Sequence, residues 1–116
     1  MTTPTDKPVF AFTVTASDVT DPPTAYCEPH SVTVTASNTL IEFDLVTPGY
    51  SFDPDTPITF NTATTDFPNL WVISATQVTM RDRCQTPGDF AFTLHVVQDS
   101  SGKRFGVDPA VRNQPA

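Results

Sequence analysis

The chain has 116 residues, enough for one domain that buries about two-thirds of the surface its unfolded form exposes. Its 13 acidic and 6 basic side chains give a formal net charge of −7, which repels phosphate backbones and anionic lipid head groups. Nucleic acid and membrane surfaces are therefore excluded as expected partners. No apolar stretch approaches the ~20 residues of a membrane-spanning helix, and residues 1–7 lack the basic and apolar regions of a secretory signal, so a cytoplasmic protein is expected.

The composition favours strands over helices. Twelve prolines would break the hydrogen-bond ladder of a helix, and the many threonines prefer the pleated backbone. A first strand is predicted over Pro8–Ala16, with Phe10, Phe12 and Val14 on one face. Ser17–Pro29 is rich in Asp and Pro and is predicted to be a long loop.

A hairpin is predicted next along the chain. His30–Ala36 and Thr39–Val46 both alternate apolar with polar side chains, and Ser37-Asn38 between them is short enough for a tight turn. The apolar side chains of the second strand are expected to face inward, and its acidic side chains to face water. The inward set is Ile41, Phe43 and Leu45, and the outward set is Glu42 and Asp44.

Shorter elements are expected in the middle of the chain. Tyr50–Asp55 is turn-rich, and Thr56–Phe60 is predicted to be a short strand. Leu70–Ser74 carries Trp71 and Ile73 on one face, and Gln77–Arg81 carries Val78 and Met80, which predicts two short strands or one strand broken at Ala75.

The clearest alternation lies near the carboxyl end, in Phe90–Val97. Pro87-Gly88-Asp89 introduces this run, and Gln98–Gly102 separates it from Lys103–Val107, which predicts a β-hairpin. One face of the first strand is expected to be entirely apolar, because side chains alternate between the two faces of a strand. That face consists of Phe90, Phe92, Leu94 and Val96.

About seven short strands separated by turn residues, with no helical period, predict an all-β fold. The expected architecture is an antiparallel two-sheet sandwich of immunoglobulin-like type, with a closed barrel as the alternative. Residues 8–116 are expected to form this single domain, and residues 1–7 a flexible leader.

The two cysteines, Cys27 and Cys84, are 57 positions apart, a separation that can bridge two sheets. Trp71 lies much nearer the second cysteine than the core tryptophan of an immunoglobulin domain does. Free thiols are expected for a cytoplasmic protein, with a disulfide as the alternative. No paired Cys or His-Cys spacing suggests zinc.

No arrangement of residues points to catalysis. His30 and His95 are the only histidines, and Ser31 beside His30 would point to the opposite face of the strand. Neither a nucleophile elbow nor a zinc-protease motif is present. We therefore expect a protein that is not an enzyme and that needs no cofactor, with a hydrolase using a loop Asp and His30 or His95 as the alternative.

Loop carboxylates and aromatic side chains are the candidate ligand contacts. Six aspartates, namely Asp18, Asp21, Asp53, Asp55, Asp66 and Asp108, could converge at one end of a sandwich and hold calcium, although their spacing matches no EF-hand. Tyr26 and Tyr50 are expected in loops, exposed for stacking on a ligand, whereas Trp71 is expected to face the core. The candidate contact residues are Tyr26, Tyr50, Asp53 and Asp55.

The carboxyl-terminal tail contains Asp108-Pro109, Asn113 and Pro115. Proline lacks the donor that a sheet ladder needs, so Pro109 is expected to end the preceding strand and Pro115 to block further pairing. Val111 and Asn113 would then run along a sheet edge as a protective strap. These residues are interpreted as a structural terminator.

The same tail, with Gly88-Asp89-Phe90 and Asp99–Lys103 before it, resembles the bacterial DP-EP family, named after its Asp-Pro and Glu-Pro signature. Here the second element reads Gln114-Pro115. The resemblance covers about the last thirty residues and implies a small β-sandwich protein without an established activity. A looser similarity in size and strand content to inclusion-body proteins of the AidA/PixA group implies self-assembly or sugar binding.

Taken together, these patterns predict a non-enzymatic β-sandwich binding or assembly module, which presents its loops or an open sheet edge to a protein partner or to its own copies. The alternative is a carbohydrate-binding module, with or without calcium, which would use the loop tyrosines, Trp71 and the loop aspartates.

Overall fold

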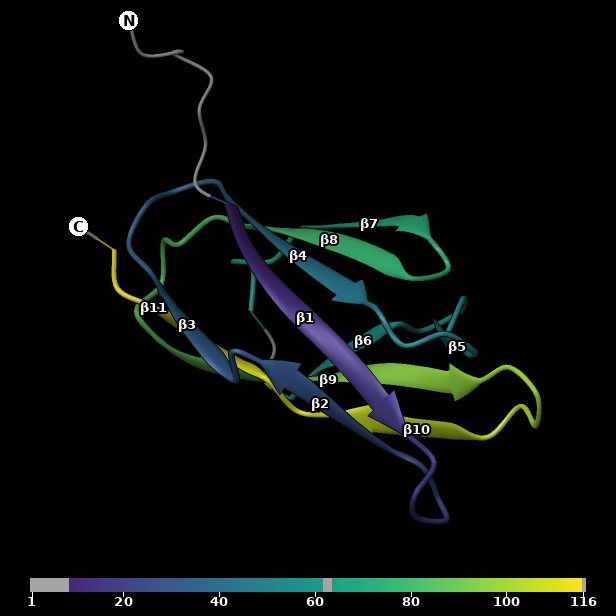
Figure 1. The fold of residues 1–116 in the computed structure, drawn as a ribbon. Coiled ribbons are helices and arrows are strands. Elements are labelled where there is room, and N and C mark those ends of the chain that lie inside the picture. Colours follow the sequence, from purple (N-terminus) through teal and green to yellow (C-terminus); the bar gives the residue numbers. More distant parts are fainter. Residues whose placement is uncertain (1–8, 62–63, 116) are drawn as a thin grey trace, which may run out of the picture.

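The computed structural model describes residues 9–61 and 64–115, so the predicted leader lies outside the described residues. The described residues form eleven strands in two sheets and contain no helix (Figure 1). The first sheet has the order β2 (Thr24–Glu28), β1 (Val9–Ser17), β4 (Thr39–Leu45), β8 (Gln77–Asp82) and β7 (Asn69–Ser74). The second sheet contains β3 (Ser31–Val34), β5 (Tyr50–Phe52), β6 (Ile58–Phe60), β9 (Gly88–Gln98), β10 (Arg104–Val107) and β11 (Ala110–Asn113).

Strand β9 is the central strand of the second sheet and pairs along both of its edges. β10 and β11 follow one edge in a single register, which continues across Asp108-Pro109. Pro109 cannot donate, but its carbonyl accepts a hydrogen bond from the Phe92 N–H at 3.2 Å. The two short strands are therefore one strand interrupted at the proline, and the predicted hairpin at Phe90–Val97 is confirmed.

The opposite edge of β9 carries β5 and β6. The chain between them, from Asp53 to Pro57, leaves the ladder opposite His95. The backbone carbonyl of His95 accepts a hydrogen bond from the Asp53 N–H, and the backbone N–H of His95 donates to the Pro57 carbonyl, both at 2.9 Å. Two prolines in this bulge remove donors from the edge. The edge is thereby short and irregular.

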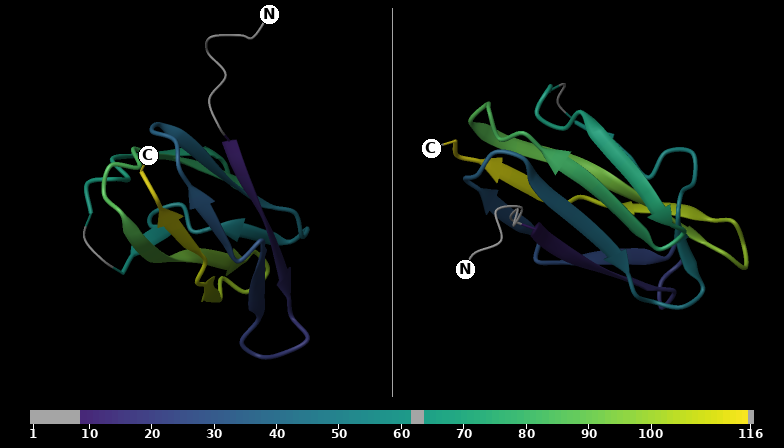
Figure 2. Two further views of the ribbon diagram at one scale, coloured as in Figure 1. Left: turned by 90° about the vertical axis from the view of Figure 1, so that its left-hand side faces the viewer. Right: turned by 90° about the horizontal axis from the view of Figure 1, so that it is seen from above.

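Figure 2 shows the arrangement of the strands from two further sides. The core lies between the two sheets. Phe43 of β4 stacks on Phe12 of β1 with ring centroids 5.0 Å apart, and meets Phe92 of β9 edge to face at 5.6 Å. The alternating apolar faces predicted for β1, β4 and β9 point inward, because both sheets turn their apolar face toward the other. The buried apolar residues of these three strands are Phe12, Val14, Ala16, Ile41, Phe43, Leu45, Phe90, Phe92, Leu94 and Val96.

The prediction of purely antiparallel sheets is wrong. β1 pairs with β4 in parallel, and so does β11 with β3, which makes both sheets mixed. The predicted hairpin at Ser37-Asn38 is wrong for a related reason. β3 and β4 belong to different sheets, so this turn, where Asn38 has a φ of 59°, carries the chain from one layer to the other.

Two strands lie in segments that are rich in turn residues and were not predicted to be strands. The predicted loop Ser17–Pro29 contains β2, which pairs with β1, and the predicted turn Tyr50–Asp55 contains β5, which pairs with β9. Tertiary pairing overrides the local preference of Pro and Asp in both places. The hairpin of β7 and β8 confirms the alternative of two short strands meeting near Ala75.

Both cysteines are buried free thiols, as expected. Burial raises the pKa of the Cys27 thiol to about 11. The Cys84 thiol donates to the Val34 carbonyl at 3.2 Å, and burial raises its pKa also.

Candidate interaction site

Among the described residues, strand β7 forms a free edge of the first sheet and pairs only with β8 (Figure 1). Its four consecutive apolar residues, Leu70, Trp71, Val72 and Ile73, are all exposed. The prediction that Trp71 faces the core is wrong, because 43% of its surface is accessible. Trp71 lies opposite Thr79, whereas the buried Val78 and Met80 lie opposite Val72 and Leu70, so Trp71 is on the outer face of the sheet.

Strands β5, β6 and β3, at the edges of the second sheet, offer less to a partner. β5 and β6 have three residues each and are separated by the proline-containing bulge, and β3 alternates Ser and Thr with valines. β7 has six residues without a charge, and the uncharged stretch continues to Gln77. Native edges are usually protected by charge, proline or a bulge. β7 has no charged residue and no proline, and of these three devices it has the bulge, a register shift at Ile73 between Val72 and Ser74.

A largely apolar cavity of about 470 Å³ lies where the end of β7 approaches β5. A backbone hydrogen bond from Phe52 N–H to the Ala75 carbonyl, 2.8 Å long, joins the two sheets there. The cavity is lined by Ser51, Phe52, Asp53, Pro54, Val72, Ser74, Ala75, Val97 and Asp99. Val72 thus belongs both to the free edge and to the cavity.

Two carboxylates of the cavity lining differ in how they are held. Asp53 accepts from the N–H groups of Asp55 and Thr56 at 2.9 and 3.1 Å, and pairs with Arg104 Nε at 2.7 Å. These backbone hydrogen bonds, together with Arg104, lower the pKa of Asp53. Asp99 is exposed and accepts from the Ser51 hydroxyl at 2.6 Å, and no cationic side chain among the described residues pairs with it.

The four predicted contact residues do not form one site. Tyr26 is exposed but lies on β2, at the edge of the first sheet opposite β7. Tyr50 lies on β5 and is buried, with its ring edge to face against Phe105 at 5.8 Å, so the prediction of an exposed tyrosine pair is wrong. Asp53 and Asp55 share one turn, in which the Asp53 carboxylate is committed to backbone donors.

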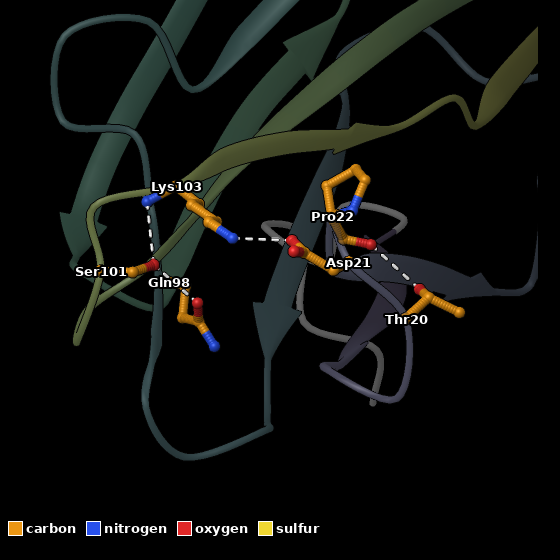
Figure 3. A network of polar contacts seen from close by, with 6 residues as sticks. All are labelled: Thr20, Asp21, Pro22, Gln98, Ser101 and Lys103. Carbon is orange, nitrogen blue, oxygen red and sulfur yellow. Dashed lines mark hydrogen bonds and ion pairs between the residues drawn. The ribbon is translucent and has the colours of Figure 1, made fainter.

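The loop aspartates do not gather at one end of the molecule. Asp21, in the connection from β1 to β2, pairs with Lys103 Nζ at 2.7 Å and so joins this connection to the turn between β9 and β10 (Figure 3). Asp66 is buried and accepts a hydrogen bond from the Asn113 amide. Within residues 9–61 and 64–115, no group of three or more His, Cys, Asp or Glu side chains is placed to hold a metal ion.

A buried polar cluster, which the sequence did not reveal, consists of Asp66, Asp82 and Asn113. The Asn113 amide donates to Asp66 Oδ2 at 2.9 Å and to Asp82 Oδ1 at 2.8 Å. Backbone N–H groups of residues 84, 85 and 86 also donate to these two carboxylates. This cluster connects the β6–β7 connection, the end of β8 and β11, and only contacts distant in sequence bring its members together.

His95 lies on the outer face of the second sheet, where its Nε2 is 2.8 Å from the Thr59 hydroxyl. Desolvation, with the nearby Arg104 charge, lowers the pKa of His95. His30 is exposed and directly precedes β3. Neither His95 nor His30 lines the cavity beside β7. The two histidines are therefore separate from the exposed apolar edge.

The tail residues take different positions from those expected. β11 lies between β9 and β3 and is paired on both sides, so the prediction of a strap along a sheet edge is wrong. Asp108 is exposed and accepts from the Thr93 hydroxyl at 2.6 Å, Pro109 and Asn113 are buried, and Pro115 is partly buried.

Neither a known family model nor any curated protein matches this chain. The described part of the chain contains no helix that is long and apolar enough to cross a membrane.

Proposed function

We propose that this protein is a non-enzymatic binding or assembly module whose interaction surface is the free edge of β7. The observation that carries the proposal is the unbroken apolar run Leu70–Ile73, which is exposed on both faces of an unpaired strand edge. Such an edge presents main-chain donors and acceptors to an incoming strand, while pockets beside it select side chains. The cavity next to Val72 is such a pocket.

The test compares two lysine substitutions on the outer face of the same sheet. Trp71→Lys places a charge on the edge strand, whereas Thr79→Lys places the same charge on β8, one strand inward. We expect Trp71→Lys to abolish association, measured by light scattering for copies of the chain and by pull-down for a partner, and Thr79→Lys to leave it intact. A wild-type chain that stays monomeric and captures nothing would contradict the proposal.

A carbohydrate-binding module is the second candidate, because Trp71 is exposed on the outer face of the first sheet, where a ring can stack on a sugar. A glycan array tests it directly, and a thermal-shift series with calcium tests the metal-assisted form, since a ligand of the native state raises the melting temperature. Absence of both signals would eliminate this candidate.

Three further expectations from the sequence stay proposals. An immunoglobulin-like arrangement of the strands is supported by the two packed sheets and by the change of sheet between β3 and β4. A place in the DP-EP family is supported by the tail motif alone, and a solved member with the same strand order would test both. A cytoplasmic location is supported by two free thiols, and fractionation of the native host would test it.

A further inference from the structure

We propose that the strand accepted by β7 is an extended segment of a different protein, with an apolar side chain that fills the cavity beside Val72 and a Lys or Arg that pairs with Asp99. This inference rests on the proposed function and names the chemistry of the partner.

The apolar part follows from the position of the cavity. Leu70 and Val72 lie on the inner face of β7, opposite Met80 and Val78. Side chains directly opposite each other in paired strands share a face, about 4.5–5.5 Å apart. An added strand would therefore place its inner-face side chains next to Leu70 and Val72, at the mouth of a cavity that Val72, Ser74 and Ala75 line. At about 470 Å³ the cavity has the size of a ligand pocket.

The basic part follows from the charges around that cavity. Lys103 pairs with Asp21 at 2.7 Å (Figure 3). Arg104 pairs with Asp53, also at 2.7 Å. Asp99, which lines the cavity, therefore keeps an uncompensated charge among the described residues. The Ser51 hydroxyl donates a hydrogen bond to Asp99 Oδ1. A cation brought by the partner would complete this acidic rim.

Charge also favours a different protein over a second copy of this chain. The segment from Asn69 to Gln77 is uncharged, so a second β7 would bring no cation to Asp99. Two copies would also each carry a net charge of −7 and repel each other as they approach. A basic segment would instead be attracted, with an association rate that falls as salt is added.

The experiment selects random ten-residue peptides, displayed on phage, on the immobilised full chain, and removes those that also bind the Val72→Lys variant. We expect the retained peptides to alternate apolar with small polar residues and to carry Lys or Arg. The best peptide is then synthesised with Lys and with Glu at the basic position, and its binding is measured by fluorescence polarisation. The Lys form should bind about fivefold more tightly than the Glu form, as expected for one rim ion pair.

Two variants identify the contacts. Asp99→Asn should remove the preference for the Lys form, and Asp55→Asn, which changes a neighbouring exposed carboxylate outside the cavity lining, should preserve it. Thermal unfolding of each variant checks that the fold is retained. Equal binding of the Lys and Glu forms would overturn the partner chemistry and leave the proposed function standing.

Two other outcomes would also overturn the inference. In the first, no peptide loses binding to the Val72→Lys variant, but Trp71→Lys dissociates a homodimer. The strand that pairs with β7 then comes from a second copy of the chain, and the proposed function of the β7 edge is retained. If no peptide depends on Val72 and the chain is monomeric without a partner, both this inference and the proposed function fail.

Discussion

Three side chains in the buried polar cluster each leave one oxygen without a hydrogen-bond partner among the described residues: Asp66 Oδ1, Asp82 Oδ2 and Asn113 Oδ1. Burial and the nearby Asp66 charge raise the pKa of Asp82, while the donors from Cys84 and Asn113 oppose this effect. The folded chain therefore binds the Asp82 proton more tightly than the unfolded chain does. The resulting stabilisation is fully present below the ordinary pKa of 3.8 and is lost as the pH rises through the raised value.

Asp82→Asn should remove this pH dependence. The amide retains an oxygen that can accept from Cys84 N–H and from Asn113, and it carries no charge to bury. We expect the melting temperature to rise relative to wild type at pH 7 by roughly 5 °C, and the difference to shrink toward pH 4. Asp18→Asn, at an exposed position, is the matched control. A difference that is the same at both pH values would contradict the assignment.

Gly106 faces His95 across the hairpin in a space too small for a side chain. A Cβ atom there would lie 2.9 Å from Thr93 Cγ2 and 3.1 Å from the Leu94 carbonyl oxygen. Gly106→Ala should therefore cost about 1–3 kcal/mol of unfolding free energy.

Part of that cost should be recovered in a Thr93→Ser background. Serine lacks the obstructing methyl group but keeps the hydroxyl that donates to Asp108. Urea unfolding of the two single variants and the double variant measures the coupling. Additive effects would show that Thr93 does not limit the space.

At the scale of the element, the four-residue strand β11 contacts two other strands and the buried polar cluster. It is paired with β9 on one side and β3 on the other, and it delivers Asn113 to the two buried carboxylates. The tail thus contributes its last strand to the interior of the second sheet and not to an edge. Asn113 and Asp108 belong to the same predicted motif but have very different surroundings.

Asn113→Ala should destabilise the fold by at least about 3 kcal/mol, because it leaves two buried carboxylates without their shared donor. Asp108→Ala removes only an exposed acceptor for the Thr93 hydroxyl and should cost no more than about 1 kcal/mol. Chemical denaturation of the two variants compares them directly. Equal losses would mean that the buried cluster contributes little.

Prediction succeeded for strands with regular alternation and missed two strands that lie among turn residues. β1, β4 and β9 alternate over seven or more residues, so their inner faces follow from the pattern alone. β2 and β5 are short and lie among turn residues, and only pairing with β1 and β9 makes them strands. Leu70–Ile73 is apolar at every position, so alternation alone does not decide which of these residues are covered.

For the molecule as a whole, the sandwich protects both cysteine side chains without a disulfide. Cys27 lies on β2 and Cys84 follows β8, and both are buried. The pKa of about 11 for Cys27 keeps its reactive thiolate scarce at neutral pH.

A thiol-reactive chromogenic disulfide at pH 8 should therefore label the folded chain slowly at both positions. It should label two thiols rapidly once urea unfolds the sandwich. Absorbance during labelling measures both rates. Rapid labelling of the folded chain would show that the thiols are reached without global unfolding.

The sequence by itself determined the all-β character and the inward faces of the long strands, because a two-residue period is local and requires no knowledge of the partner strand. The tertiary structure decided which strands pair, that two pairs run in parallel, and that β7 is left with an open apolar edge. It also decided the meeting of Asp66 and Asn113, which are 47 positions apart. Such features depend on contacts distant in sequence, and each is selected by the packing of the whole sandwich.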